Sequence, residues 1–288
     1  MKILALLSLL VVSQVWASWS VSTYNIRNFD HDYQAGETNL RELGKNLKAF
    51  KSDVMAFVEV VNVNAFEQVV KDNLPGYLTQ ISNCGGFGKQ KLAIAFNPKI
   101  FSFVSSAEDM SFSGSSGSKC GSLRPVFLVT LQHKSSKEFY LFAAIHLKAG
   151  GAESAMQQRW GQYAKLEKLA ARHSEKNLIM LGDFNTTGYN LKNEDFTHFE
   201  DLLDRASLKS TSENLACTSY WTGTLGTGQH QSSILDHIVL DKNLSDSVKD
   251  VVLGSHCAAL KCKDATPEEL GVSYQTVSDH CPIQVTFK

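Results

Sequence analysis

Polar side chains that could do acid–base or metal chemistry stand at the ends of apolar runs. Glu59 ends the run Val54–Val58, for example, and His146 ends Leu141–Ile145. An ionised carboxylate is costly at a buried strand position unless it is paired or binds a metal. Each residue alone also fits an exposed turn, but the whole set predicts one catalytic centre. The set is Asn25, Glu59, His146, Asp183, Asn185, Asp236, Asp279 and His280.

The elements that must position these residues can be predicted from hydrophobic patterning. Apolar residues at helical spacing predict helices over 40–50 and 156–170, and Asn64 is expected to cap a shorter helix through Val70. The Ser/Gly-rich stretch 105–122 is expected to be a loop, and strands mixed with helices favour an α/β or α+β sheet protein. Short apolar runs predict strands over 21–26, 53–60, 91–96, 126–131, 139–146, 177–183, 234–240 and 283–287.

The first 17 residues are expected to be a signal peptide. Lys2 is followed by an apolar run and then by Ala17 at a cleavage point. Residues 18–288 would then form one domain. The 288-residue chain is 43% hydrophobic and 20% charged, which excludes global disorder. Its formal net charge of −1 argues against a polyanion binder that relies on bulk positive charge, so a phosphate must be held by a local site or a metal.

The cysteine count indicates an oxidising compartment. Six cysteines follow the leader, and an even number behind a leader favours disulfides in a secreted or periplasmic protein. Six cysteines allow 15 pairings, among which the sequence does not choose. Zinc is disfavoured because there is no CxxC pair or histidine pair at ligand spacing.

Six short motifs resemble the endonuclease/exonuclease/phosphatase superfamily, and most closely its deoxyribonuclease I branch. They occur in the family's order, and the resemblance covers nearly all of the chain after the leader. One such motif alone is a weak signal, whereas six in order are strong. The motifs are residues 23–29, 53–60, 144–148, 182–185, 235–238 and 278–282.

The resemblance implies a fold and a reaction. The fold would be a four-layer αββα sandwich of the α+β class, with the active site at one end of two packed sheets. The reaction would be phosphoester hydrolysis assisted by Mg²⁺, with Mn²⁺ or Ca²⁺ as alternatives. Glu59 would be the main metal carboxylate, with Asn25 and Asp279 nearby, because Mg²⁺ prefers oxygen ligands.

The resemblance also implies a role for each polar group. Asp183 would orient or activate the attacking water together with His280, and Asn185 would donate to a phosphoryl oxygen. Asp236 would fix the tautomer of one histidine. His146 and His280 would flank the scissile phosphate, one favouring attack and the other supporting the leaving oxygen.

The chain departs from the family pattern around this centre. Val61 stands where a basic residue for minor-groove contact is expected, and Gln90 lies where a glutamate would support His146. Arg124 is one residue off the expected spacing and remains a candidate phosphate contact. A second resemblance, to secreted bacterial nucleases of the superfamily, adds Lys148 and Arg159 as candidates for flanking phosphates.

The leading hypothesis is a secreted or periplasmic, metal-dependent nuclease that acts as a monomer on DNA, with RNA as a further substrate and no membrane partner. A phospholipid or sphingomyelin phosphodiesterase, or a phosphomonoesterase, is the alternative on the same fold. The Gly-, Thr-, Gln- and Ser-rich stretch 222–233 lacks the apolar patch expected of a lipid enzyme. A non-catalytic binding or toxin subunit is the alternative of another class.

Overall fold

Two six-stranded mixed sheets pack face to face in the computed structural model, which describes residues 18–30, 36–115, 117–174, 177–223, 226 and 228–288. The proposed signal peptide, residues 1–17, lies outside the described residues. The first sheet has the order β13 (Val248–Leu253), β14 (Ile283–Phe287), β1 (Ser20–Phe29), β2 (Val54–Val60), β4 (Lys91–Phe96) and β3 (Leu78–Ile81). The second has the order β5 (Phe101–Asp109), β6 (Val126–His133), β7 (Phe139–His146), β8 (Asn177–Asp183), β12 (Asp236–Asp241) and β9 (Leu208–Ser210).

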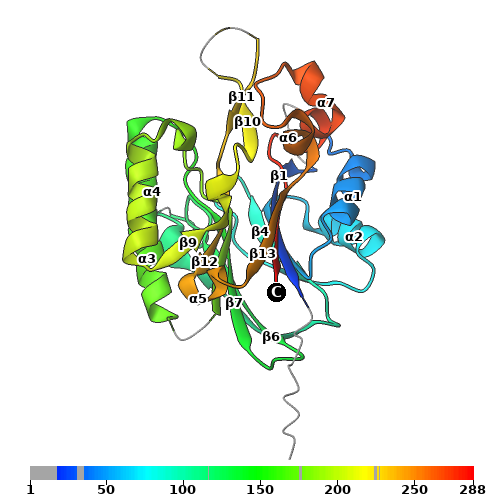
Figure 1. The fold of residues 1–288 in the computed structure, drawn as a ribbon, viewed down its shortest axis with the longest axis vertical. Helices are drawn as coiled ribbons and strands as arrows, with labels where there is room; N and C mark the ends of the chain where they lie inside the picture. Colours follow the sequence, from blue (N-terminus) through cyan, green and yellow to red (C-terminus); the bar gives the residue numbers. More distant parts are fainter. Residues whose placement is uncertain (1–17, 31–35, 116, 175–176, 224–225, 227) are drawn as a thin grey trace, which may run out of the picture.

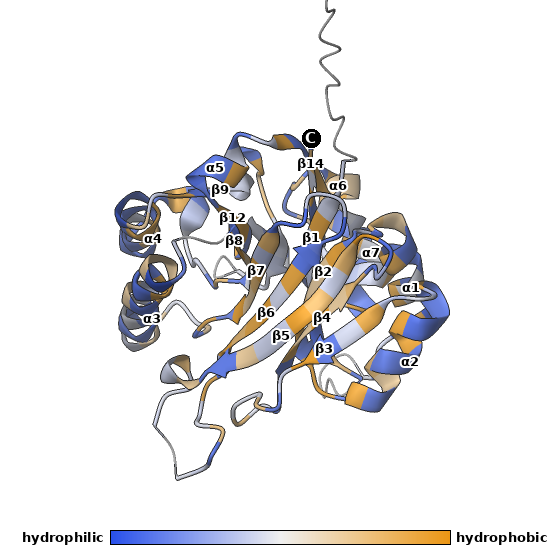
Figure 2. Ribbon diagram, turned by 90° about the horizontal axis from the view of Figure 1, so that it is seen from below, coloured by the Kyte–Doolittle hydropathy of each residue, from blue (hydrophilic) through white to orange (hydrophobic). Residues whose placement is uncertain are grey.

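Helices cover the outer face of each sheet, which completes the expected four-layer αββα sandwich (Figures 1 and 2). The pair α1 (Leu40–Ala49) and α2 (Val63–Asn73) lies on the first sheet, and the pair α3 (Glu153–Arg172) and α4 (Glu194–Arg205) lies on the second. The hairpin of β10 (Ser219–Trp221) and β11 (Gln231–Ser233) stands at one end beside α6 (Ser255–Leu260) and α7 (Pro267–Thr276). The remaining short helices are η1 (Met110–Phe112), η2 (Tyr189–Leu191), η3 (Thr211–Asn214) and α5 (Lys242–Ser245).

Strand alternation explains the layers. In β2, Val54, Ala56 and Val58 enter the core between the sheets, while Met55 and Phe57 enter the core beneath α1 and α2. Successive side chains of a strand point to opposite faces, so a wholly apolar strand is suited to burial on both sides. All eight predicted strands are confirmed with shifts of a few residues at their ends. Most of them have this pattern, whereas β6 and β14 alternate buried with half-buried residues.

The structure corrects several local expectations. Asn62, not Asn64, caps α2, because its side chain accepts from the N–H of Ala65. The stretch expected to be a loop from residue 105 begins inside β5, whose middle residues are mostly exposed at the sheet edge. No strand was expected for β3 or β13, which are also edge strands and have few buried residues.

All six cysteines form disulfides, which resolves the 15 possible pairings. The pairs are Cys84–Cys120, Cys217–Cys262 and Cys257–Cys281. The last one joins α6 to the residue that follows His280. Within the described part of the chain, no helix is long and apolar enough to cross a membrane.

Gly182 allows β7 and β8 to approach each other directly before the polar residues at their ends. It has φ of +143°, and a Cβ at this position would lie 2.0 Å from the carbonyl oxygen of Ile145. Any side chain would therefore collide with the backbone of the neighbouring strand, in a conformation that L-residues rarely adopt.

We expect Gly182→Ala to lower the free energy of unfolding by at least about 2 kcal/mol, because strain and collision act together. Gly161→Ala is the matched control, since Gly161 lies in α3 and a Cβ there has no neighbour within 4 Å. The control should gain about 0.5–1 kcal/mol from helix propensity. Urea unfolding of both variants measures the difference, and equal stability would contradict this account of Gly182.

Candidate functional site

The sheet topology brings the predicted polar residues to one end of the sandwich. Strands β1 and β2 are parallel and end near Asn25 and Glu59, and β7 and β8 are parallel and end at His146 and Asp183. Strands β12 and β14 run antiparallel to their neighbours, so their first residues lie at the same end. Asp183 is in register with His146 on one side and with Asp236 on the other.

Asn25 links the two sheets at this end. Its side-chain nitrogen donates to Glu59 Oε1 and to Asp183 Oδ2, each at 3.1 Å. Its oxygen accepts from the N–H of Arg27 at 2.9 Å, and the second oxygen of Glu59 accepts from the N–H of Asn28 at 2.8 Å. One amide thus holds a carboxylate from each sheet in a fixed relation, and Asn25 presents its nitrogen to them.

His146 lies against both of these carboxylates. Its Nε2 is 3.6 Å from Glu59 Oε1 and 3.6 Å from Asp183 Oδ2, and the side chain is 3% exposed. Burial lowers the pKa of His146 well below 6.5, and the charges of Arg124 and His280 lower it further. The imidazole is therefore neutral at physiological pH, and its Nε2 can accept or donate one proton in contact with the carboxylates.

Asp236 and His280 form a buried pair. The Nδ1 of His280 donates to Asp236 Oδ2 at 2.7 Å, which leaves Nε2 directed toward Asp183 at 3.9 Å. Burial opposes the charged imidazole, but the attraction and hydrogen bond of Asp236, with Asp183, raise the pKa of His280 well above 6.5. Thr218 fixes the start of β12, since its hydroxyl accepts from the N–H of Asp236 at 3.0 Å.

Burial also changes the acidity of the carboxyl groups. It raises the pKa of Asp183 to about 6, although His280 and the N–H of Asn185 favour the charged form. It raises the pKa of Glu59 as well, and the charge of Asp279 adds to that rise. Like charges confined in one buried cluster are stabilised by a nearby cation.

The backbone is strained where several of these side chains are presented. Glu59 has φ of 68°, Asn185 has φ of 54° and Asn28 has φ of 43°, all in the left-handed region. The pairing of β2 with β4 shifts register between Phe57 and Val60, which marks a bulge at Glu59. Such strain costs about 1–3 kcal/mol per residue and gathers at functional sites.

The donor set suits a hard divalent cation. Ligand atoms of Glu59, His146 and Asp183 lie within 4.8 Å of one another, and so do those of Asp183, Asp236 and His280. The Oδ1 atom of Asp279 is buried and has no hydrogen-bond partner among the described residues. Carboxylate oxygens are the ligands that Mg²⁺ prefers, so the residues present fit the implied metal.

Two of the three candidate phosphate contacts, Arg124 and Lys148, lie beside this cluster, and Arg124 is half-buried there. The guanidinium of Arg124 donates to the carbonyls of His146 and Leu147. Burial lowers the pKa of Arg124, and the charges of Glu59 and Asp183 oppose that shift. The ammonium of Lys148 lies on the surface, where it donates to a neighbouring carbonyl at 2.7 Å.

Arg159 is different, and the structure corrects the expectation that it binds a flanking phosphate. Its side chain is fully buried, and all five of its N–H groups are directed at protein oxygens. No donor remains for a phosphate.

Three groups that support the site differ from what the sequence led us to expect. Two of them, Asn28 and Thr218, were not predicted, and Gln90 has a different partner. Gln90 does not contact His146 but donates to Asn28 Oδ1 at 2.8 Å, and His146 Nδ1 has no hydrogen-bond partner among the described residues. Asn28 and Thr218 were not singled out. Asn28 lies inside the first motif but acts through its backbone, whereas nothing local marks Thr218, which lies 18 residues from Asp236.

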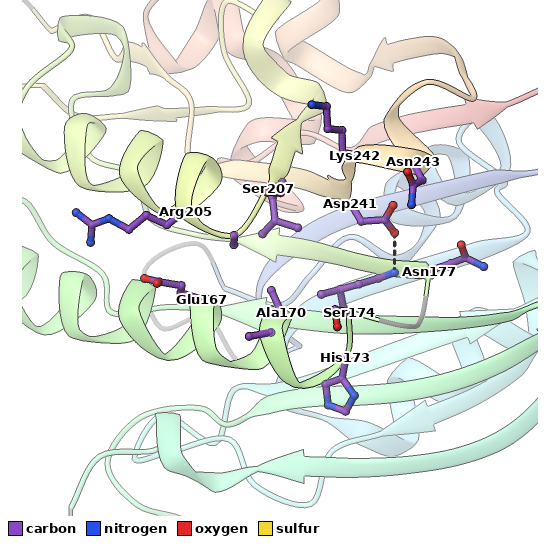
Figure 3. A pocket seen from close by; sticks show the side chains of 14 residues that line it. Glu167, Ala170, His173, Ser174, Asn177, Arg205, Ser207, Asp241, Lys242 and Asn243 are labelled. Atoms are coloured by element: carbon purple, nitrogen blue, oxygen red, sulfur yellow. Dashed lines mark hydrogen bonds between the residues drawn. The ribbon is translucent and has the colours of Figure 1, made fainter.

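A cavity of about 470 Å³ lies at the opposite end of β8 and β12 (Figure 3). It is lined by the last turns of α3 and α4 and by the turn from β12 into α5. The carboxylate of Asp241 accepts from the backbone N–H groups of Leu178 and Leu244, so it is already used to hold the chain. The cavity brings together none of the residues predicted to do chemistry.

An αββα sandwich with carboxylates and histidines at one end of its sheets defines a class of phosphoesterases. The chain belongs to the Endonuclease/Exonuclease/phosphatase family, whose model matches residues 22–280. A comparison with curated proteins finds no significant match.

Solved structures with this fold resemble the chain closely in shape and weakly in sequence. Zebrafish (D. rerio) TDP2 in complex with a single-strand DNA product superposes with a TM-score of 0.66 at 17% identity, over 94% of this chain and 99% of that one. The human Nocturnin catalytic domain with bound sulfate gives 0.62 at 17% identity, over 94% of each chain. A family protein from Bacteroides thetaiotaomicron gives 0.62 at 18% identity, over 94% and 97%.

We expect Asp236→Asn to lower the pKa of His280, because a neutral amide does not attract the imidazolium, while burial still opposes its charge. NMR titration of the His280 ring measures this shift. A raised folded-state pKa stabilises the protein fully below the unfolded value of about 6.5, and this contribution is lost as pH rises through the folded value. The variant should therefore be less stable than the wild type by the largest amount near pH 6, and this difference should shrink as pH rises through the folded pKa of His280.

Asp201→Asn is the control for this comparison, since Asp201 pairs with Arg205 on an exposed face of α4. It should change stability by less than about 0.5 kcal/mol and leave His280 unaffected. An unchanged His280 pKa in Asp236→Asn would contradict the assigned pairing.

Proposed function

We propose that the protein is a secreted, divalent-metal-dependent nuclease that hydrolyses phosphodiester bonds in DNA, with RNA as a second substrate. The observation that carries the proposal is the buried cluster in which Asp183 lies between the Nε2 atoms of His146 and His280, at 3.6 and 3.9 Å. Family membership supports a hydrolytic enzyme, because nucleases and phosphatases share this fold.

The residues of the cluster can divide the work of phosphoester hydrolysis. Asp183 is the carboxylate that orients or activates water together with His280, and Asp236 fixes the tautomer of that histidine through Nδ1. His146 and His280 flank the scissile phosphate, one favouring attack and the other supporting the leaving oxygen. Asn185 donates to a phosphoryl oxygen, and its side-chain nitrogen now makes one long bond of 3.3 Å to a backbone carbonyl.

The divalent cation would be held chiefly by Glu59, with Asp279 and Asn25 beside it. When bound, it would offset the negative charge that develops on the phosphate. A cation at this position would give the unpartnered, buried oxygen of Asp279 a partner. It would also stabilise the carboxylate of Glu59 against burial, which raises the pKa of that group. Mg²⁺ is the ion we propose, with Mn²⁺ or Ca²⁺ as substitutes.

Nucleic acid is favoured over a lipid substrate. TDP2, a structural relative, is complexed with a DNA product, and Arg124 and Lys148 lie where they could contact a polyanion beside the cluster. Among the described residues of the hairpin next to His280, Trp221 is the one large apolar side chain that is exposed, at 45%. A lipid enzyme would instead expose a contiguous apolar patch.

Export fits the covalent structure. The three disulfides are typical of an oxidising compartment, and residues 1–17 carry the pattern of a leader. We therefore propose that residues 18–288 are the mature monomeric enzyme in the periplasm or outside the cell.

We expect Mg²⁺ to raise the melting temperature of the mature protein, because a ligand of the folded state stabilises it by mass action. At about 100 times the dissociation constant the gain is about 2.7 kcal/mol, or several degrees for a chain of this size. Glu59→Gln should lose most of the shift. Glu67→Gln, on the exposed face of α2, should keep it. An absence of any metal-dependent shift would favour a non-catalytic binding subunit.

We expect the protein with Mg²⁺ to cut plasmid DNA, and a gel comparing circular, linear and single-stranded DNA with RNA tests this directly. Sphingomyelin liposomes and a phosphomonoester are assayed in parallel. Choline release without DNA cleavage would replace the proposal with a lipid phosphodiesterase. Intact DNA and RNA under all conditions would reject a nuclease.

Within the same assay, Glu59→Ala, His146→Ala and His280→Ala should each lower turnover by at least about 10²-fold, as for lost metal or acid–base groups. His173→Ala is the control, because His173 lines the cavity at the other end of the molecule. Wild-type turnover in all three site variants would show that the cluster is not the active centre.

A further inference from the structure

The segment that follows His146 is held by side chains at nearly every peptide group. Arg124 donates to the carbonyls of His146 and Leu147, and the N–H of Lys148 donates to Gln162 Oε1 at 2.8 Å. The Nη1 atom of Arg159 donates to the carbonyls of Lys148 at 2.6 Å and of Gly150 at 3.1 Å. Residues 147–150 form no regular secondary structure, so these bonds replace the missing ladder.

The guanidinium of Arg159 also contacts a second loop. Its Nη2 atom donates to the hydroxyl of Thr187 at 2.7 Å, two residues after Asn185. Its Nε and Nη2 atoms donate to Asp195 at 2.7–3.2 Å, in the first turn of α4. Arg159 therefore connects the segment after His146, the loop after Asn185 and the start of α4.

The charge pair at the centre of this contact is fully buried and fully bonded. Arg159 and Asp195 are both 0% exposed. Asp195 also accepts from Trp160 Nε1 at 2.9 Å and from the Thr187 hydroxyl at 3.2 Å. A planar guanidinium directs its five donors in a fixed fork, which a lysine ammonium does not reproduce.

We propose that Arg159, with Gln162 one turn along the same face of α3, is a positioning residue of the phosphodiester-cleaving centre. It holds the two loops that directly follow His146 and Asn185 at a fixed separation without touching the substrate. Its importance for turnover rests on the proposed function. Displacing a reacting group by about 1 Å can cost about 10²-fold in rate. If the bonds from Arg159 to the two loops are weakened, we therefore expect turnover to fall and substrate binding to stay the same.

The test compares Arg159→Lys with Arg172→Lys, a matched substitution on the same helix. Arg172 is exposed and pairs with Asp109, so its variant should behave as the wild type. With a small phosphodiester, bis(4-nitrophenyl) phosphate, Arg159→Lys should lower kcat by at least about 10-fold and change KM by less than about 3-fold. A rise in KM alone would instead make Arg159 a phosphate contact and overturn the proposal.

Hydrogen exchange provides a readout that does not depend on activity. In Arg159→Lys, amides of residues 147–150 and 186–188 should exchange at least about 10-fold faster, while those of β7 and β8 remain protected. If exchange equals that of Arg172→Lys, Arg159 does not hold the two loops. If exchange is faster but kcat is unchanged, Arg159 holds the loops but has no role in turnover. A wild-type protein that cleaves no phosphodiester would reject the proposed function, and exchange would still decide whether Arg159 holds the loops.

Discussion

The structure depends on a constraint of electrostatics, namely that several carboxylates share one buried cluster. Glu59, Asp183 and Asp236 come from three different strands, and each needs donors or positive charge to stay ionised away from water. The Asn25 amide serves two of them, and His280 serves the third. The geometry of the strand ends follows from meeting that requirement.

The need to donate hydrogen bonds to these carboxylates explains backbone conformations that are otherwise unfavourable. The left-handed conformations of Asn28 and Asn185 aim their N–H groups at Glu59 and Asp183, at 2.8 Å each. Because Gly182 has no side chain, β7 can approach β8 closely, which places His146 beside Asp183. Strain at these positions is balanced by hydrogen bonds to charged groups, which are stronger than neutral ones.

The sequence predicts the central strands and most of the candidate site for the same physical reason. A strand buried on both faces must be apolar throughout, so a polar residue at its end, such as Glu59 or His146, stands out. Edge strands such as β5 and β13 carry few buried side chains and have no such contrast. The helix α4 was also missed, although Asn193 caps it and its buried residues recur at helical spacing.

The role of Arg159 could not be read from local pattern. A charged residue on a helix is usually solvated, so a surface position or a phosphate contact is the natural expectation. Its partner Asp195 lies 36 residues away in another helix, and the carbonyls that it binds belong to an irregular loop. Pairing at that separation is set by the packing of α3 against α4, which no periodicity in either segment reveals.

The net charge of the chain and the acidity of the cluster also limit how a phosphate substrate can be bound. The chain has a net charge of −1, and the cluster itself is acidic, so long-range attraction does not concentrate a polyanion at this site. Binding would have to come from a few local cations, namely the proposed metal and Arg124 beside the cluster. Recognition of the phosphate by the centre is then separate from recognition of what the phosphate is attached to. This separation explains how one fold accommodates nucleases and phosphatases, with the surrounding loops selecting the substrate.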